Sequence, residues 1–483
     1  MLKNLLKISL VLMLLLPNIV LAQTKQKISL LLYNGKIFTA DENYSTAEAV
    51  AVDGEKIVAV GTSAELRNKY QAEKEIDLQG KLVTPGFNDA HVHFLRGGLS
   101  LLTVDLTGTK TLAEALAKVA AKAKEVKAGE WIIGRGWDHT IWKQNFPTAK
   151  DLDKVSPNNP AFFVRVDGHV AWVNSAVLKL AGIDRNTKNP DGGEVEKDSS
   201  GEPTGILKEK AQDLVTNFVP QPTVEQMEKG LELALDMAKH YGITSVQDNS
   251  GYETTKIYHD FLRQNKLTVR VAEWQAFDDS IDEIKRQRAE FAALKDDPNR
   301  LKLTALKGFV DGTLGSRTAS LLLPYSDDDK NTGILRYTPE KLTKMIVERD
   351  AAGFQIALHA IGDRANRMAL DGFAAIYQNW LSEREKRDIN MGERSSFIPK
   401  RHRIEHAQVV NPADFKRFAE LKIIASMQPS HAISDKRWAE DRLGEYRVLG
   451  AYAWHLMRSY GVHVPFGTDF PVESINPYRT LYA

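Results

Sequence analysis

The sequence predicts an α/β protein built on a (β/α)8 barrel of the TIM type. Apolar runs of strand length recur along the 483-residue chain, and helical patterns separate most of them, which is the order of parallel β/α units. Eight such runs, the number that closes a barrel, lie at residues 83–94, 245–248, 269–277, 303–310, 354–360, 403–409, 423–428 and 462–467. The helical patterns between them lie at residues 254–264, 280–294, 339–352, 365–380 and 412–421.

Residues 1–22 have the pattern of a secretory signal peptide. Lys3 and Lys7 make a short basic region, residues 8–16 are an almost unbroken apolar run, and residues 20–22 offer small side chains to a signal peptidase. The apolar run is too short to span a bilayer comfortably. We therefore expect cleavage near Ala22 and an exported protein, periplasmic or secreted; an uncleaved membrane anchor is the alternative.

Residues 23–85 are expected to form a small β unit. Asn-Gly, Asp-Gly and Gln-Gly dipeptides supply turns. They separate strand-like runs at residues 28–32, 49–52, 56–60 and 81–84. A unit of this size buries little core by itself, so we expect it to pack on another part of the protein.

The barrel is expected to comprise residues 86–100 and 242–483, with residues 101–241 inserted after its first strand. The inserted segment is mixed and rich in Trp, Gly, Pro and Asp, with helices expected at 111–126 and 224–240. Only residues 471–483 follow the last strand-like run, too few for a closing helix and a flanking segment. We therefore expect the chain to end prematurely.

Composition excludes several classes of protein. The chain has no Cys, so it has no disulfide scaffold, zinc finger, iron–sulfur cluster or thiol nucleophile, and any metal must be held by nitrogen and oxygen. Its 64 basic and 63 acidic residues nearly balance, which argues against a general nucleic-acid or membrane-surface binder. We expect the protein to bind a small molecule, and neither nucleic acid nor, in its mature form, a membrane. Whether it forms a homodimer is left open.

Metal-binding residue types recur at the ends of the predicted strands, where reactive groups of a closed barrel lie. His91 and His93 point the same way because side chains alternate along a strand, and two imidazoles one pleat apart can hold a cation such as Zn²⁺. The other candidates at strand ends are Lys307, His359, His406 and Asp469. Each is weak evidence alone, but their combination at separate strand ends is hard to explain by packing.

Five segments resemble the amidohydrolase superfamily, in particular its family 3 branch of YtcJ-like and N-substituted-formamide-deformylase-like proteins. They are PGFNDAHVH at 85–93, FVDGTLGSRTA at 309–319, HAIGDRA at 359–365, RIEHAQ at 403–408 and GTD at 467–469. The resemblance covers nearly the whole chain after residue 22. It implies a (β/α)8 barrel with a β-sandwich built from both chain ends, of which this chain carries the N-terminal part.

The resemblance also implies roles for the strand-end residues. His91, His93, His359 and His406 are expected to bind one or two divalent ions, most simply Zn²⁺. Asp469 is expected to bind metal or orient water and to act as general base, while a metal-activated water attacks an amide-type carbonyl. In some branches a strand-four lysine is carbamylated and bridges two metals, so Lys307 has that role or is a buried lysine paired with Asp311.

Substrate recognition is expected to involve side chains outside this set, namely Trp137, Asp138, His169, Arg317 and His431. The alternative role for Trp137 is packing in a core. Arg317 suits a substrate carboxylate, and its alternative role is a structural ion pair with a nearby acid. The expected function is metal-dependent hydrolysis of non-peptide C–N bonds. The alternatives are a non-catalytic metal- or ligand-binding protein on the same barrel and a deaminase or isomerase variant.

Overall fold

The computed structural model describes residues 24–143, 145–165, 170–190, 193–391 and 399–483, and the predicted signal peptide lies outside these residues. The chain divides between Gly86 and Phe87 into two compact units. Among the described residues, no helix combines the length and the apolar character needed to cross a membrane.

The described residues of the first unit, from residue 24 on, form two small sheets and one helix. The four-stranded sheet has the order β5-β4-β1-β6, with β1 at Gln26–Tyr33, β4 at Ala49–Asp53, β5 at Lys56–Gly61 and β6 at Tyr70–Asp77. The three-stranded sheet has the order β3-β2-β7, with β2 at Lys36–Phe38, β3 at Thr46–Ala47 and β7 at Leu82–Val83. The helix is α2, Ser63–Lys69, which begins with a capping box between Thr62 and Glu65.

The sequence analysis missed α2 and β6. At seven residues, α2 is too short for a clear helical period. The segment QAEKEI of β6 is mostly polar and exposed, but the strand pairs in parallel with β1 over its whole length. Backbone pairing with a distant strand, rather than local apolar character, therefore places β6 in the sheet.

The second unit contains a parallel sheet of seven strands in the order β20-β19-β18-β17-β16-β15-β8. The strands are β8 Phe87–Val92, β15 Ile243–Asp248, β16 Arg270–Ala276, β17 Leu301–Phe309, β18 Gln355–Ala360, β19 Arg403–His406 and β20 Ile424–Ser426. They correspond to the first seven strand-like runs of the sequence, and confirm the prediction of a parallel α/β barrel sheet.

The eighth predicted run, residues 462–467, is not a regular strand. It still joins the two edges of the sheet: Phe466 makes a parallel bridge to Met427, next to β20, and its carbonyl accepts a hydrogen bond from the nitrogen of Ala90 in β8. Further along, the nitrogen of Asp469 donates to the carbonyl of His91 at 2.8 Å. This irregular segment nearly closes the barrel.

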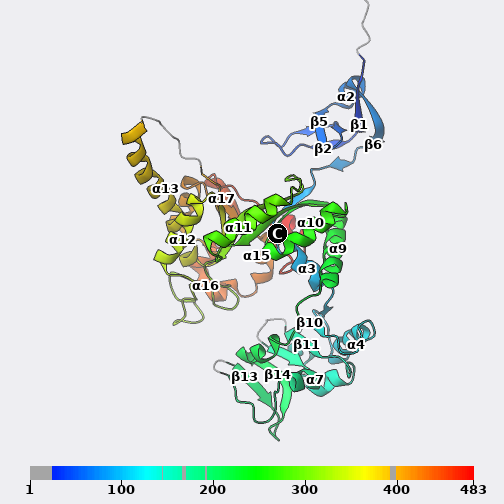
Figure 1. Ribbon diagram of the computed structural model, residues 1–483, viewed down its shortest axis with the longest axis vertical. Helices are drawn as coiled ribbons and strands as arrows, with labels where there is room; N and C mark the ends of the chain where they lie inside the picture. The colour runs from blue at the N-terminus through cyan, green and yellow to red at the C-terminus, as the bar shows by residue number, and fades with distance from the viewer. Residues whose placement is uncertain (1–23, 144, 166–169, 191–192, 392–398) are drawn as a thin grey trace, which may run out of the picture. The chain divides into compact units, whose positions relative to one another are not determined.

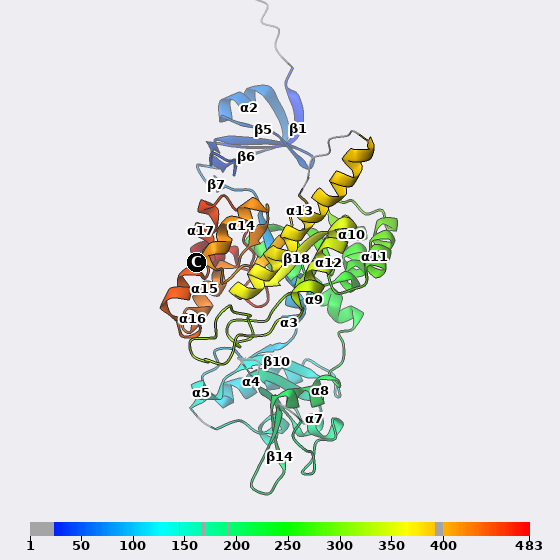
Figure 2. The same ribbon diagram turned by 90° about the vertical axis from the view of Figure 1, so that its left-hand side faces the viewer.

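Helices cover the outer face of the sheet (Figures 1 and 2). Those that follow or precede its strands are α3 Phe94–Ser100, α9 Val224–Tyr241, α10 Thr255–Arg263, α11 Ile281–Ala293, α12 Pro339–Ala351, α13 Asp363–Met391 and α14 Phe415–Glu420. Shorter helices follow in the last part of the chain: α15 Pro429–Asp435, α16 Ala439–Arg447, α17 Trp454–Ser459 and α18 Pro477–Tyr482. The short helix α18 lies in the segment after the eighth run.

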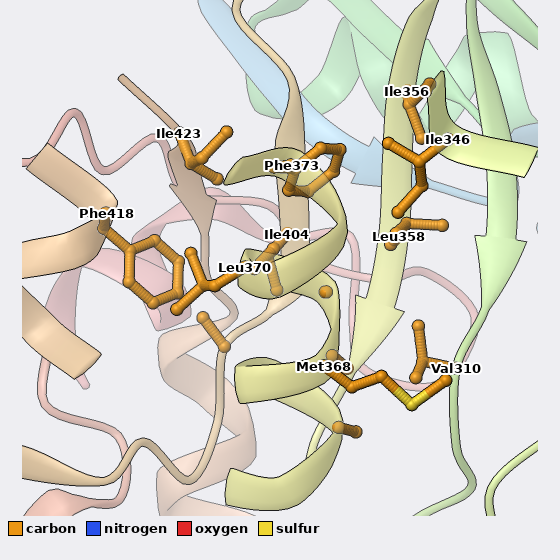
Figure 3. Close-up of a cluster of buried hydrophobic side chains, with 14 of the residues drawn as sticks. Val310, Ile346, Ile356, Leu358, Met368, Leu370, Phe373, Ile404, Phe418 and Ile423 are labelled. Carbon is orange, nitrogen blue, oxygen red and sulfur yellow. The ribbon is translucent and has the colours of Figure 1, made fainter. Parts of the chain in front are cut away.

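The largest hydrophobic core lies between the sheet and helices α12, α13 and α14 (Figure 3). Ile356 and Leu358 of β18 and Ile404 of β19 pack there against Leu370 and Phe373 of α13. Each is a fully or almost fully buried apolar side chain, and burial of one such side chain contributes about 1.5–3 kcal/mol. This core packs against β17, β18 and β19, which carry Lys307, His359 and His406 of the site described below.

The segment between β8 and α9 contains its own sheet, which the loop-rich sequence did not predict. Its six strands have the order β13-β14-β12-β11-β10-β9 and are β9 Val104–Asp105, β10 Ile132–Trp137, β11 Ala161–Arg165, β12 Val170–Val173, β13 Gly193–Lys197 and β14 Pro203–Glu209. Its helices are α4 Leu112–Ala123, α5 His139–Trp142, α6 Ala149–Asp153, α7 Ser175–Leu180 and α8 Asp213–Thr216. The helices predicted at 111–126 and 224–240 correspond to α4 and α9.

Candidate metal centre

Side chains of the parallel sheet that point into the barrel form the candidate metal centre. Along β17 and β18, Leu306 and Leu358 belong to the core beneath the helices. Lys307 and His359, one residue later in each strand, therefore point to the opposite, inner face. Nζ of Lys307 lies 3.3 Å from Nε2 of His91, so the His91 side chain of β8 also lies on the inner face of the barrel.

Three of the predicted ligands come together. Donor atoms of His91, His406 and Asp469 all lie within 4.8 Å of one another, and all three side chains are buried. Nε2 of His93 lies 3.3 Å from Oδ1 of Asp469. The ring of His359 lies 4.5 Å from that of His406, between ring centres.

His359 differs from the other histidines in its hydrogen bond. Its Nε2 lies 3.0 Å from the carbonyl oxygen of Gly312 and 3.6 Å from a carboxylate oxygen of Asp311. Of its two ring nitrogens, Nε2 therefore faces the loop after β17. The structure places His359 at the edge of the group formed by His91, His406 and Asp469.

Two of the site residues have a backbone conformation that is unusual for residues other than glycine. His406 has a φ of 72° and Asp469 a φ of 57°. Simple alternation along β19 would send His406 to the helix side with Ile404, and the left-handed turn at its end directs the imidazole to the site instead. Such conformations cost about 1–2 kcal/mol each and concentrate at functional sites.

Two buried polar atoms of this cluster have the surroundings expected of metal ligands. Nδ1 of His406 and Oδ1 of Asp469 are buried and have no hydrogen-bond partner within the part of the chain that the structure describes. A buried polar atom without a partner costs free energy, so such atoms in one cluster call for a ligand. Imidazole nitrogen and carboxylate oxygen are ligands of Zn²⁺ and related divalent ions, so these residues fit a divalent metal.

The protonation states of the histidines also suit metal binding. Burial lowers the pKa of His91 to about 4 and the pKa of His359 to about 3. Burial and the neighbouring His359 hold the pKa of His406 well below its usual value. All three imidazoles are therefore neutral at pH 7, and only a neutral imidazole has a lone pair to give to a metal.

Asp469 is ionised in the same surroundings. Burial by itself would raise the pKa of this carboxyl group, but the nearby imidazoles of His93, His91 and His406 outweigh it and hold the pKa well below its usual value. Nε2 of His431 lies 3.7 Å from Oδ2 of Asp469. The carboxylate thus faces imidazoles on both of its oxygens and is available as a ligand or as a proton acceptor.

Lys307 is buried inside the barrel, and burial lowers the pKa of its amine to about 8. Its Nζ lies 4.8 Å from the ring centre of Phe309. The alternative prediction, that Lys307 pairs with Asp311, is wrong. The carboxylate of Asp311 instead accepts hydrogen bonds from the backbone nitrogens of Ser320, Ile361 and Gly362. Among the described residues, no ion pair joins Lys307 to Asp311.

Glu405 is a residue of the site that the sequence did not predict. Its Oε2 lies 2.6 Å from Nδ1 of His91, and both side chains are completely buried. Arg403 binds both oxygens of Glu405, at 2.7 and 3.0 Å. The signal in the sequence was the spacing of Arg403 and Glu405, two residues apart in a predicted strand, which places an unexpected ion pair on the inner face.

The predicted substrate residues are not all in one place. His431 lies beside Asp469, and a very small pocket of about 10 Å³ next to the metal centre is lined by His406, Gln408, Met427, Gln428, His431, Tyr452 and Trp454. Arg317 binds Asp327 through two hydrogen bonds of 3.1 and 2.9 Å, which is the structural ion pair considered from the sequence.

Trp137 and Asp138 lie in the inserted segment. The Trp137 side chain is fully buried, its indole donates to the carbonyl of Phe163 at 2.9 Å, and it packs against Trp142 and Trp172, which are the contacts of a core residue. Asp138 accepts a hydrogen bond of 2.7 Å from Arg165. The predicted substrate residue His169 lies outside the described residues.

Three curated relatives are similar to this chain over most of its length. Protein LONG AFTER FAR-RED 3 of Arabidopsis thaliana is 33% identical over 94% of this chain and 77% of its own. The putative amidohydrolase YtcJ of Bacillus subtilis (strain 168) is 32% identical over 92% of this chain and 81% of its own. The N-substituted formamide deformylase of Arthrobacter pascens is 27% identical over 94% of this chain and 82% of its own.

A solved structure and a family model agree with these relatives. The crystal structure of an uncharacterized metal-dependent hydrolase from Pyrococcus furiosus has a TM-score of 0.73 and 29% identity, and the match covers 94% of this chain and 87% of that one. The model of the amidohydrolase family matches residues 74–483, and the bacterial imidazolonepropionase-like composite domain matches residues 49–70. The chain belongs to the amidohydrolase family and is an enzyme that hydrolyses carbon–nitrogen bonds other than peptide bonds.

Proposed function

We propose that this protein hydrolyses a small amide-type compound, such as a formamide or a cyclic amide, at the centre formed by His91, His406 and Asp469. The observation that carries the proposal is the convergence of these donor atoms within 4.8 Å inside the barrel, with two of the atoms buried and unpartnered among the described residues. The similarity to an N-substituted formamide deformylase favours an amide or formamide as the substrate class.

His91, His93, His359, His406 and Asp469 are the residues that would hold the metal. When bound, a divalent cation supplies Lewis-acid activation of water and of the amide carbonyl. Zn²⁺ suits the nitrogen and oxygen donors. We include Lys307 as a further ligand in carbamylated form if two ions bind, because its lowered pKa of about 8 makes the neutral amine accessible near neutral pH.

Asp469 is the proposed general base. Its carboxylate is ionised, so it accepts the proton of the attacking water and then returns it to the leaving nitrogen. His93 at 3.3 Å and His431 at 3.7 Å face its two oxygens and limit its rotation. His431 also lines the pocket beside the centre, so it is the predicted substrate residue that geometry favours.

Chelation tests the proposed function. The purified full-length protein should contain a stoichiometric divalent metal and hydrolyse one or more members of a panel of formamides, cyclic amides and N-acyl amines. Removal of the metal should abolish turnover, and return of Zn²⁺ or another divalent ion should restore it. Metal-free protein that keeps full activity on the panel would contradict the proposal.

We retain three further proposals from the sequence. Export after cleavage near Ala22 is supported by the basic and apolar regions of residues 1–22. Residues 23–85 are proposed to be the N-terminal part of a β-sandwich, which the two small sheets suit. Trp137, Asp138 and His169 of the inserted segment are kept as substrate candidates, although the described contacts of Trp137 are structural. For Arg317 we favour the structural alternative, because its guanidinium is paired with Asp327. The assembly is left open, with a homodimer as one option.

A further inference from the structure

The two histidines of the HVH segment are held in different ways. Nδ1 of His93 lies 2.9 Å from the backbone carbonyl of Asn249, which is a neutral acceptor. Nδ1 of His91 lies 2.6 Å from the side-chain carboxylate of Glu405, which comes from the opposite end of the sequence. A histidine that meets a buried carboxylate has a stronger and more directional hydrogen bond than one that meets a carbonyl.

Arg403 keeps Glu405 in its charged form and in one position. The guanidinium binds both carboxylate oxygens, and its NH2 group also donates to the carbonyl of Ala90 and to Oγ of Ser426, each at 2.8 Å. It lies 4.8 Å from the ring centre of Trp274. The contacts join β19 to β8 and to β20, so neither Arg403 nor Glu405 can rotate without breaking bonds to neighbouring strands.

This arrangement determines which nitrogen of His91 carries the proton. An ionised carboxylate only accepts hydrogen bonds, so Nδ1 of His91 must be the donor. In a neutral ring Nε2 then has the lone pair. The position of Lys307 agrees, because its Nζ, a donor group, lies 3.3 Å from Nε2. The lone pair therefore faces the place where Asp469, at 3.5 Å from Nε2, also presents an oxygen.

We propose that Glu405, held by Arg403, is a positioning residue that fixes the tautomer and the direction of the His91 imidazole for a divalent cation. The inference rests on the proposed function in one respect, that the cluster binds a metal. Carboxylates that orient a metal-bound histidine in this way raise the basicity of the ligand, and their loss commonly weakens metal affinity 10–100-fold, roughly.

The chain offers a control in a second histidine–carboxylate pair, in which the histidine is buried and the carboxylate is partly buried. Nε2 of His402 lies 3.0 Å from Oδ1 of Asp350, and Nδ1 of His402 accepts a hydrogen bond from the nitrogen of Ile356 at 3.1 Å. His402 precedes β19, at the opposite end of that strand from His406. Asp350→Asn thus removes a carboxylate from a buried histidine without touching the metal centre.

The experiment compares metal binding by the full-length protein and its variants, made metal-free by chelation. Affinity for Zn²⁺ is measured by competition with a chromophoric chelator, and Co²⁺ is added to read the ligand field from its visible spectrum. Glu405→Gln is expected to weaken affinity for Zn²⁺ by about 10–100-fold and to change the Co²⁺ spectrum. Asp350→Asn is expected to leave both as in the wild type.

Glu405→Asp serves as a second variant, because it keeps the charge opposite Arg403 and so protects folding, while it withdraws the carboxylate from His91. It is expected to lose affinity to a smaller extent than Glu405→Gln, with its folded state verified by thermal unfolding. Wild-type affinity and spectrum in a folded Glu405 variant would overturn the positioning role. A wild-type protein that binds neither metal would overturn the proposed function instead.

Discussion

Nε2 of His93 lies 3.3 Å from Oδ1 of Asp469, although the two residues are at opposite ends of the barrel sequence. The irregular segment that nearly closes the barrel makes this approach possible, since the nitrogen of Asp469 donates to the carbonyl of His91. The base proposed for catalysis is thus fixed to the backbone of β8, the strand that carries His91. Its reactivity depends on how the barrel closes.

Asp469→Asn is expected to lower kcat/KM by at least about 10²–10⁴-fold, because the amide cannot accept the proton of the attacking water. The histidines stay in place, so metal should still bind. Steady-state kinetics on the best amide of the panel and metal analysis of the same preparation check both parts. Asp350→Asn controls for the loss of a carboxylate elsewhere. Full activity in Asp469→Asn would refute its assignment as base.

The His91 imidazole is expected to stay neutral in the metal-free protein until the pH falls to about 4, because burial lowers its pKa to that value. The unfolded chain takes up this proton near pH 6.5. The unfolded state therefore binds more protons in this interval, and His91 lowers the free energy of unfolding as the pH falls from about 6.5 to about 4, by about 3 kcal/mol.

The titration is checked by NMR of protein labelled with ¹⁵N-histidine. The signal of His91 is the one that disappears in His91→Gln. A midpoint near the ordinary histidine value of about 6.5 would contradict the expected protection by burial.

Gly467→Ala is expected to disturb the metal centre. A Cβ at this position would lie 2.6 Å from the backbone nitrogen of His91 and 2.7 Å from its Cβ, so the closing segment or β8 must shift. We expect a loss of about 1–3 kcal/mol in the free energy of unfolding and weaker Zn²⁺ binding.

Gly461→Ala is the control for that substitution. A Cβ there meets no described heavy atom within 4 Å, although the φ of 77° makes alanine strained. Thermal unfolding should register a cost in both variants, and chelator competition should register weaker metal binding in Gly467→Ala alone. Equal metal affinities for the two variants would show that the close approach to His91 is unimportant.

Arg317→Gln tests whether this residue binds substrate. The guanidinium is already paired with Asp327, and the pair is partly exposed, so its loss should cost no more than about 1 kcal/mol. We expect KM to stay unchanged for neutral and for carboxylate-bearing amides. A large rise in KM confined to the carboxylate-bearing substrates would instead assign Arg317 to the substrate site.

The strands of the barrel were predictable because their signal is local. The runs of β17 and β18 are apolar and bounded by helical patterns, and the structure has them at Leu301–Phe309 and Gln355–Ala360. The strand β6 and helix α2 were not predictable, since one is too polar and the other too short to show a period. In the site, strand-end position was enough to single out His91 and His406, which the structure brings together with Asp469.

The sequence could not distinguish a buried tryptophan from one that lines a pocket. Trp137 is of a residue type that often lines binding pockets, but its packing against neighbouring tryptophans shows that it belongs to a core. Glu405 is the converse case. Its partner His91 is 314 residues away, so no local pattern marks the carboxylate as part of the site.

The sequence by itself determined the order of the seven barrel strands and most of the helices between them, the nitrogen and oxygen chemistry of any metal site, and the candidates at strand ends, because apolar period and residue type are local properties. Tertiary structure alone decided which candidates meet, how His406 and Asp469 turn at positive φ toward the centre, and which carboxylate orients His91. Those outcomes depend on the closure of the sheet, which brings together backbone and side chains from distant parts of the chain.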